Sequence, residues 1–195
     1  MRNHIPVMAT SQPSICVFCG ASFGNDPIFA QDAARLGAGL AARGFAMVFG
    51  GGNPGLMGVT ACAARDAGAP VTGILPGFLR DLEPPLNEGE TTEIVADLFV
   101  RKEVMIARSD AFVVLPGGLG TYDEFFEVVT GAQLGVHDKP IILVNTRGYF
   151  DNLDALLRDA VQHGFVREAN LTLYEMVPDA DAALEALAKL FQNSR

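Results

Sequence analysis

Short apolar runs alternate with segments of helical periodicity along nearly the whole chain, and this alternation constrains the fold more than any other feature. The apolar runs predicted to be strands are Ile15–Cys19, Ala46–Phe49, Pro70–Leu75, Ile94–Ala96, Ala111–Leu115, Ile141–Asn145 and Leu171–Val177. The segments predicted to be helices are Ile28–Arg43, Leu56–Ala67, Leu98–Arg108, Tyr122–Leu134, Asn152–His163 and Asp179–Gln192. Continuous apolar strands separated by helices are typical of a parallel sheet covered on both faces. The pattern therefore predicts a doubly wound, Rossmann-like α/β fold.

A single domain over residues 14–195 accounts for this pattern. The chain has 195 residues, which is enough for one core without a disulfide or metal to support it. Residues 1–13 are polar and contain proline, so we expect a flexible leader rather than a secretion signal. No apolar run approaches the roughly 20 residues that span a bilayer, so we expect no membrane partner. The odd count of three cysteines predicts reduced thiols and a cytoplasmic location.

The charge balance narrows the class of ligand. The formal net charge is −9, with only 14 lysines and arginines, which argues against binding to nucleic-acid polymers because phosphate backbones require an excess of basic residues. It does not exclude a single nucleotide held by backbone amides and a few cations.

Cys16 and Cys19 form a C-x-x-C pair that could suggest redox or zinc chemistry. Residues three apart on a strand point to opposite faces, and the chain has no second pair to complete a zinc site. We therefore interpret both as small buried residues. Since no His, Cys or Asp cluster has metal-ligand spacing, we expect neither a metal nor a cofactor.

The first glycine run follows a predicted strand and precedes a helix. Gly50, Gly52 and Gly55 satisfy G-x-G-x-x-G, but the next strand ends at Leu75 without the acidic residue that a dinucleotide site requires. No Lys-Ser or Lys-Thr follows, which excludes a P-loop. Anion binding and a tight turn with close strand–helix packing both remain open for this run.

The second run, Pro116 to Thr121, has the same strand–loop–helix context. The carboxyl ends of parallel strands meet at one sheet edge, so we expect both runs to form one phosphate cradle there. Glu124 follows Thr121 by three residues, a spacing that fits either a functional carboxylate near a sugar or a helix capping box.

Arg101 and Lys102 are the candidate cations. The chain has few lysines, and Arg101, Met105 and Arg108 share one face of a predicted helix. Arginine suits bidentate contact with phosphate or carboxylate. The alternative is a solvated helix face.

The segment that begins at Ser109 contains the signature PGGxGTxxE, and Arg101-Lys102 precedes it. With the blocks ICVFCGAS, VFGGGNPGLMG and VTGILP in order, residues 14–190 resemble the Lonely Guy (LOG) family. The resemblance implies a homodimeric Rossmann-like enzyme, with active sites near the dimer interface, that hydrolyses the N-glycosidic bond of nucleoside 5′-monophosphates. Cytokinin riboside 5′-monophosphate would give free base and ribose 5-phosphate, and AMP would be an alternative substrate.

The same resemblance implies roles for individual residues. Arg101 and Glu124 would be the catalytic pair. The implied substrate-binding residues are Gly20, Ser22, Gly51, Gly52, Met57, Glu83, Lys102, Gly118, Leu119, Gly120, Thr121, Tyr122, Asp123 and Thr130.

Two alternative functions stay open. Related molybdenum-cofactor carrier proteins use a similar fold and glycine loops to hold a phosphorylated pterin without catalysis. Other relatives are often labelled lysine decarboxylases, but a pyridoxal-phosphate enzyme needs a Schiff-base lysine, and of the three lysines only Lys102 is near the predicted site.

Overall fold

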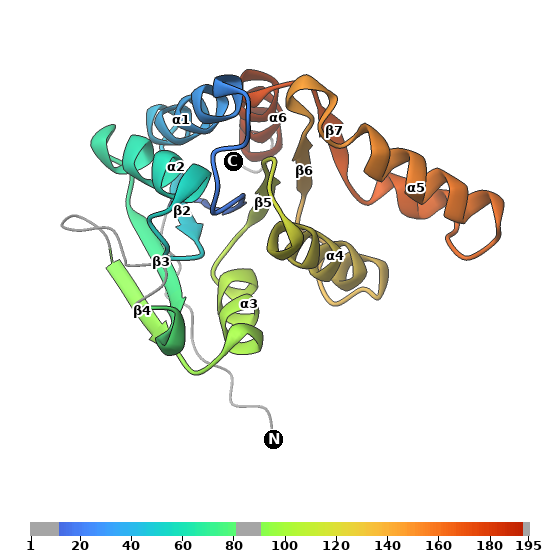
Figure 1. The fold of residues 1–195 in the computed structure, drawn as a ribbon, viewed down its shortest axis with the longest axis horizontal. Helices are drawn as coiled ribbons and strands as arrows, with labels where there is room; N and C mark the ends of the chain where they lie inside the picture. The colour runs from blue at the N-terminus through green and yellow to red at the C-terminus, as the bar shows by residue number, and fades with distance from the viewer. Residues whose placement is uncertain (1–11, 81–90, 193–195) are drawn as a thin grey trace.

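The computed structural model describes residues 12–80 and 91–192, which form one parallel sheet with helices on both faces (Figure 1). The strands are β1 (Ser14–Phe18), β2 (Ala46–Phe49), β3 (Val71–Pro76), β4 (Thr91–Val95), β5 (Ala111–Val114), β6 (Ile141–Val144) and β7 (Glu175–Val177). The helices are α1 (Pro27–Ala42), α2 (Gly55–Asp66), α3 (Leu98–Ala107), α4 (Leu119–Gln133), α5 (Asp151–Gln162) and α6 (Ala180–Gln192). Short 3₁₀ turns are η1 (Gly77–Leu79), η2 (Thr146–Gly148) and η3 (Glu168–Thr172). The predicted fold class is confirmed.

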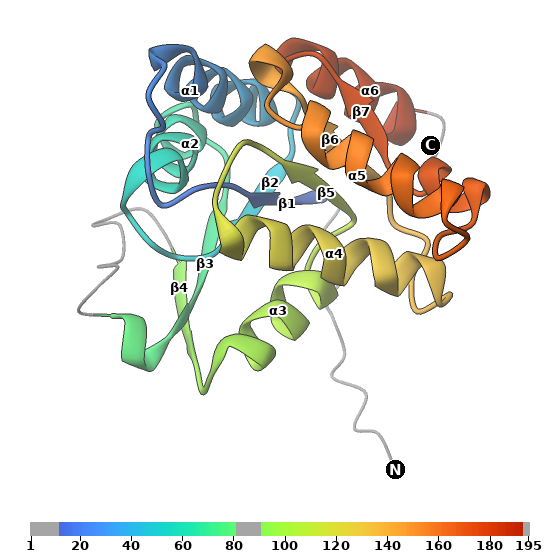
Figure 2. The ribbon, with the colours of Figure 1, turned by 45° about the vertical axis from the view of Figure 1, so that its right-hand side comes forward.

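The seven strands are all parallel and lie in the order β4-β3-β2-β1-β5-β6-β7. Figures 1 and 2 show α1 and α6 on one side of the sheet and α3 and α4 on the other. Successive strand residues enter opposite cores. Ile15 and Val17 join the core under α1, α2 and α6, whereas Cys16 and Phe18 join the core under α3, α4 and α5. This double burial is why the strands are apolar throughout.

The interpretation of the C-x-x-C pair as small buried residues is confirmed. Cys16 and Cys19 are free thiols that belong to the two different cores. Burial raises the pKa of both thiols, and the neighbouring Glu124 carboxylate adds to the effect. Both cysteines therefore stay protonated at neutral pH.

Three elements differ from the prediction by three residues or more at their first residue. The strand β4 begins at Thr91 rather than Ile94. The segment 171–177 was expected to be one strand, but its first part is the 3₁₀ turn η3, and only Glu175–Val177 pairs with β6. The backbone bonds from Asn170 to Arg167 and from Leu173 to Asn170 hold the turn. The fourth helix begins at Leu119 rather than Tyr122, because Gly118 adopts the extended N-cap conformation and the helix starts directly after it.

The order of strands reverses between β1 and β5, and a crevice opens where the connections from their carboxyl ends diverge. The loops after β1 and β5 touch each other there. The Gly20 amide donates to the Pro116 carbonyl at 3.1 Å. A Cβ on Gly117 would lie 2.7 Å from the Gly20 nitrogen and would overlap the hydroxyl of Thr121. The glycine at position 117 is therefore required for this close approach.

Some predictions fall on residues 1–11, 81–90 and 193–195, which lie outside the described residues. They include Glu83 and nearly all of the predicted leader, so the domain boundary at residue 14 stays a prediction. Pro13 is described, and its carbonyl accepts a hydrogen bond from the Ala46 amide. Within residues 12–80 and 91–192, none of the helices combines the length and apolar character that crossing a bilayer requires.

Candidate active site

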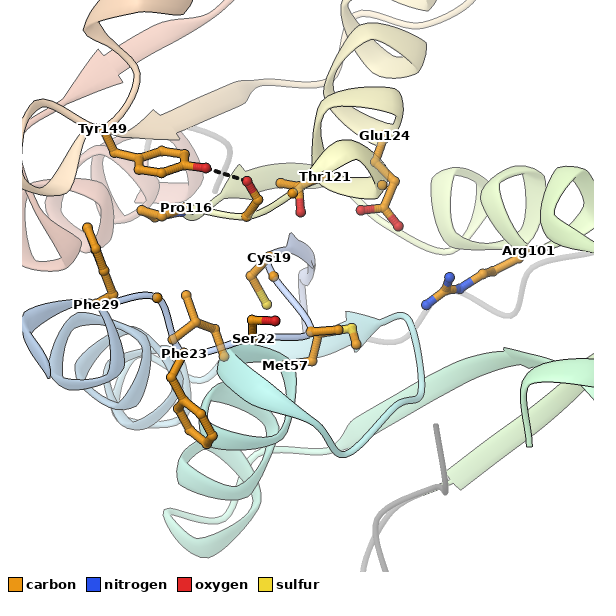
Figure 3. Close-up of a pocket in the computed structure, with 17 residues that line it drawn as sticks. Cys19, Ser22, Phe23, Phe29, Met57, Arg101, Pro116, Thr121, Glu124 and Tyr149 are labelled. Carbon is orange, nitrogen blue, oxygen red and sulfur yellow. Dashed lines mark hydrogen bonds between the residues drawn. The ribbon is translucent and has the colours of Figure 1, made fainter. Parts of the chain in front are cut away.

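A cavity of about 470 Å³ lies at the crevice between the β1 and β5 loops (Figure 3). The described residues that line it are Cys19, Gly20, Ala21, Ser22, Phe23, Gly24, Phe29, Leu56, Met57, Arg101, Pro116, Gly117, Gly118, Gly120, Thr121, Glu124 and Tyr149. Eight of them belong to the predicted site: Gly20, Ser22, Met57, Arg101, Gly118, Gly120, Thr121 and Glu124. The structure thus brings together both members of the predicted catalytic pair and the second glycine run.

The amino end of α4 forms one wall of the cavity. Gly118 is the N-cap residue, and no side chain caps this helix end. The Tyr122 amide makes the first bond of the helix, to the Gly118 carbonyl, so the amides of residues 119–121 precede the intrahelical ladder. Such amides, together with the helix dipole, favour an anion. Since Gly118 and Gly120 carry no side chain, an anion can come close to this backbone.

Glu124 faces the same cavity, one turn further along α4. The capping-box interpretation is wrong, because the N-cap is Gly118 and Thr121 is already the third helical residue. Thr121 and Glu124 are three residues apart, so they lie on one face of the helix. The functional interpretation of Glu124 is the one that fits this geometry.

Arg101 is fixed in the first turn of α3 and extends toward the cavity. Asp97 caps α3 by accepting hydrogen bonds from the amides of Phe99 and Val100. The buried Arg101 guanidinium donates from Nε to the Ile74 carbonyl at 3.1 Å and from Nη2 to the Gly50 carbonyl at 2.6 Å. These bonds use two of its five N–H donors. Figure 3 shows the guanidinium and the Glu124 carboxylate extending toward the same space.

The alternative interpretation of Arg101 as part of a solvated helix face is wrong. Of the three residues on this face, Arg101 and Met105 are buried, and Arg108, the C-cap residue of α3, is exposed and pairs with Glu93. A guanidinium held by two main-chain carbonyls is a fixed group rather than a mobile surface cation.

The first glycine run supports Arg101 instead of lining the cavity. A Cβ on Gly50 would overlap Nη2 of Arg101 and would lie 2.8 Å from its Cζ. Gly51 has a φ of +77°, which favours glycine. Gly50, Gly51 and Gly52 are not among the lining residues described above, so the predicted substrate contact of Gly51 and Gly52 stays a prediction.

The other predicted binding residues lie on different faces of α3 and α4. Lys102 bonds to Asp123 and Glu127. Leu119 is exposed, and Tyr122 packs edge-on against Phe150. Thr130 and Asp123 line a second cavity of about 400 Å³, beside Phe126 and His137. Helical periodicity separates these residues from Thr121 and Glu124, and their roles in substrate binding stay predictions.

Aromatic residues that the sequence analysis missed close the other end of the cavity. The Tyr149 hydroxyl donates to the Gly117 carbonyl at 2.5 Å, the dashed bond in Figure 3, and its ring packs edge-on against Phe29. Phe23 also lines this end. The position of Tyr149 just after β6, the strand beside β5, is the sequence signal that could have indicated it.

A metal site would require several ligating side chains close together. Within the residues that the structure describes, no group of three or more His, Cys, Asp or Glu side chains is placed to hold a metal ion.

Comparison with known proteins identifies relatives that match most of this chain. The family model described as "Possible lysine decarboxylase" matches residues 57–187. The cytokinin riboside 5′-monophosphate phosphoribohydrolase LOG3 of Arabidopsis thaliana is 43% identical over 179 residues, which cover 90% of this chain and 80% of that protein. The cytokinin riboside 5′-monophosphate phosphoribohydrolase LOG1 of the same plant is 42% identical over 179 residues, which cover 90% of this chain and 81% of that protein.

Solved structures with the same fold are more distant in sequence. The molybdenum cofactor binding protein of Rippkaea orientalis superposes with a TM-score of 0.70 at 21% identity, over 94% of this chain and 99% of that one. The Moco carrier protein of Chlamydomonas reinhardtii gives a TM-score of 0.69 at 21% identity, over 93% and 99% of the two chains. At this identity the match shows the fold alone. The extent and identity of the sequence matches show that the chain belongs to the LOG family of cytokinin riboside 5′-monophosphate phosphoribohydrolases.

Proposed function

We propose that this protein hydrolyses the N-glycosidic bond of nucleoside 5′-monophosphates, with cytokinin riboside 5′-monophosphate and AMP as substrates. The observation that carries the proposal is the meeting of Arg101, Glu124 and the amino end of α4 in one cavity. The relatives LOG3 and LOG1 are named as cytokinin riboside 5′-monophosphate phosphoribohydrolases.

The 5′-phosphate would bind at the amino end of α4. Gly20, Ser22, Gly118, Gly120 and Thr121 line the cavity, and the amides of residues 119–121 are not used by the hydrogen bonds of α4. A phosphate held there acts as a handle that fixes the position of the sugar before the reaction.

Glu124 would then face the ribose. Three residues of helix rise place it about 4.5 Å along the axis from Thr121. Cleavage of the glycosidic bond develops positive charge on the sugar, in an oxocarbenium-like transition state. A carboxylate beside the ribose can stabilise this charge or orient the attacking water. Arg101 presents its remaining N–H donors to the same space, where they can orient the carboxylate or the nucleotide.

Other chemistries have less support from the residues around the cavity. Cys19 lines the cavity, but burial raises its pKa, so the thiol is a poor nucleophile at neutral pH. A decarboxylase would need a lysine for a Schiff base. No lysine is among the lining residues described above, and Lys102 is engaged by two carboxylates.

The test is direct. Purified protein is incubated with AMP or isopentenyladenosine 5′-monophosphate, and the free base is measured by liquid chromatography. We expect base release from at least one substrate, and a loss of at least about 100-fold in Glu124→Gln. Glu185→Gln, an exposed carboxylate on α6, is the matched control and should keep wild-type activity. No base release from either substrate, or full activity in Glu124→Gln, would refute the proposal.

A carrier of a phosphorylated pterin is the second candidate function. The shared fold with the two molybdenum-cofactor proteins motivates it. Its signature would be a pterin or nucleotide that co-purifies with the protein and is not turned over. Base release at a rate that depends on Glu124 would exclude a purely passive carrier.

We also propose a homodimer with active sites near the interface. Phe126, Leu134 and Val136 are large exposed apolar residues around the second cavity, and Thr130 lies among them. Apolar patches of this kind are typical of protein interfaces. Equilibrium sedimentation should give a dimer mass, and Leu134→Glu should shift the protein toward monomer. A wild-type monomer at micromolar concentration would contradict this.

We propose that the protein is located in the cytoplasm. Cys16, Cys19 and Cys62 are all free, as expected of a protein in a reducing compartment. Fractionation of source cells should recover the protein with cytoplasmic markers.

A further inference from the structure

Lys102 makes a contact between two helices that the proposed mechanism does not use. Its Nζ lies 3.0 Å from a carboxylate oxygen of Asp123 and 2.9 Å from one of Glu127. Lys102 belongs to α3 and both carboxylates belong to α4. The lysine side chain is only 11% exposed, while Asp123 and Glu127 are 62% and 48% exposed. The Nζ also lies 5.8 Å from the centre of the Phe99 ring, so its position is restricted on several sides.

The members of this ion-pair cluster are sequence neighbours of the proposed catalytic pair. Lys102 follows Arg101 on α3, and Asp123 precedes Glu124 on α4. Adjacent residues on a helix are about 100° apart, so one can face the cavity while the next faces the neighbouring helix. One turn of α3 therefore carries both Arg101 and Lys102, and one turn of α4 carries both Glu124 and Asp123. Arg101 and Glu124 line the cavity, while Lys102 and Asp123 form the ion pair between the helices.

We propose that Lys102 is a positioning residue, which fixes α3 against α4 through Asp123 and Glu127 and so sets Arg101 relative to Glu124. This inference rests on the proposed hydrolase function. It differs from the substrate contact that the family resemblance implies for Lys102, since Lys102 is not among the described residues that line the cavity.

The magnitudes favour an effect on catalysis over an effect on stability. Ion pairs with half-exposed carboxylates contribute little to folding stability. A displacement of about 1 Å between catalytic groups can nevertheless lower a rate about 100-fold. The Arg101 guanidinium bonds to the carbonyls of Ile74 and Gly50, which lie outside α3, so a shift of α3 would weaken these bonds and change how the guanidinium faces Glu124.

The test compares Lys102→Met, which keeps the length of the stem, with Lys102→Arg, which keeps the charge. We expect Lys102→Met to lower kcat for base release at least about 10-fold, with KM and the Kd for AMP within about threefold of wild type. Lys102→Arg should recover most of kcat. Lys139→Met is the matched control: its Nζ donates to the Ile106 carbonyl of α3 rather than to a carboxylate of α4, so kcat should be unchanged.

A mutant cycle separates positioning from substrate contact. The double variant Asp123→Asn, Glu127→Gln should lower kcat about as much as Lys102→Met, and the triple variant should be no worse than either. Additive losses, or a rise in KM and Kd as the main effect of Lys102→Met, would overturn the proposal and assign Lys102 to substrate binding. Unchanged kcat in Lys102→Met would overturn it as well.

Failure of the hydrolase function would be visible separately, because wild-type protein would then release no base. The positioning role would fall with it.

Discussion

Gly50 offers a sharp test of how Arg101 is held. The sequence run Gly50-Gly51-Gly52 places a residue without a side chain under the guanidinium, and the Gly50 carbonyl accepts the Nη2 bond at 2.6 Å. An alanine at position 50 would put its Cβ 2.8 Å from Cζ of Arg101. Non-bonded carbons prefer about 3.5–4.0 Å. The same Cβ would overlap Nη2, so the guanidinium must move by at least about 1 Å.

We expect Gly50→Ala to lower the stability of the protein moderately and its activity strongly. The Arg101 side chain can adopt another rotamer, so the core does not need to rearrange, and the main loss is one charge-assisted hydrogen bond of about 1.5–3 kcal/mol. For a domain of this size, that lowers the melting temperature by roughly 3–12 °C. A displacement of about 1 Å at a catalytic group predicts a loss of about 100-fold in kcat/KM.

The assay measures base release from AMP at 25 °C alongside thermal unfolding of Gly50→Ala. Gly77→Ala is the matched control, since its Cβ would meet Ile94 at 3.7 Å, an ordinary contact distance, and it should behave as wild type. Wild-type kcat/KM in Gly50→Ala would refute the argument that Arg101 is positioned through this glycine. A loss of activity no larger than the loss of folded protein would refute it too.

Three further predictions concern other parts of the site and core. Tyr149→Phe keeps the ring but removes the bond to Gly117, so KM for AMP should rise several-fold with kcat nearly unchanged; unchanged KM would contradict a role in holding the glycine loop. Native protein treated with iodoacetamide at pH 8 should gain one adduct, at the partly exposed Cys62, because burial raises the pKa of the other two thiols; mass spectrometry that shows two or three adducts would contradict this. Thr146→Val removes the hydrogen bond to the buried Asp32 carboxylate, and urea denaturation should show a free energy of unfolding lower by about 1–3 kcal/mol; an unchanged midpoint would refute the importance of that bond.

Most of the architecture could be predicted because the strands are buried on both faces. The apolar runs at Ala46–Phe49 and Ala111–Leu115 contain no polar residue to mark an exposed side, and the structure places both in the centre of the sheet. The prediction of one strand over residues 171–177 was wrong, because the apolar residues of this segment are divided between a 3₁₀ turn and an edge strand. Apolar runs this short do not distinguish such roles.

The residues of the candidate site could be predicted only in part from the sequence. The motif identified Gly118, Thr121 and Glu124, but it treated Leu119 and Tyr122 as equivalent to them, although helical periodicity turns these residues elsewhere. Nothing local indicated that Gly50 would contact Arg101. That contact joins residues 51 positions apart and depends on tertiary packing.

The reversal of strand order between β1 and β5 has a consequence for the kinetics of folding. The two strands that flank the cavity are joined by contacts such as that between Ser14 and Asp110, which are 96 residues apart in the chain. Parallel pairing over such separations forms slowly, because a long loop must close before the contact gains any free energy. During synthesis the loop after β1 cannot pack against the loop after β5 until β5 and the start of α4 have left the ribosome. Recovery of nucleotide binding during refolding should therefore lag behind the return of helical signal, and so report the pairing that completes the sheet.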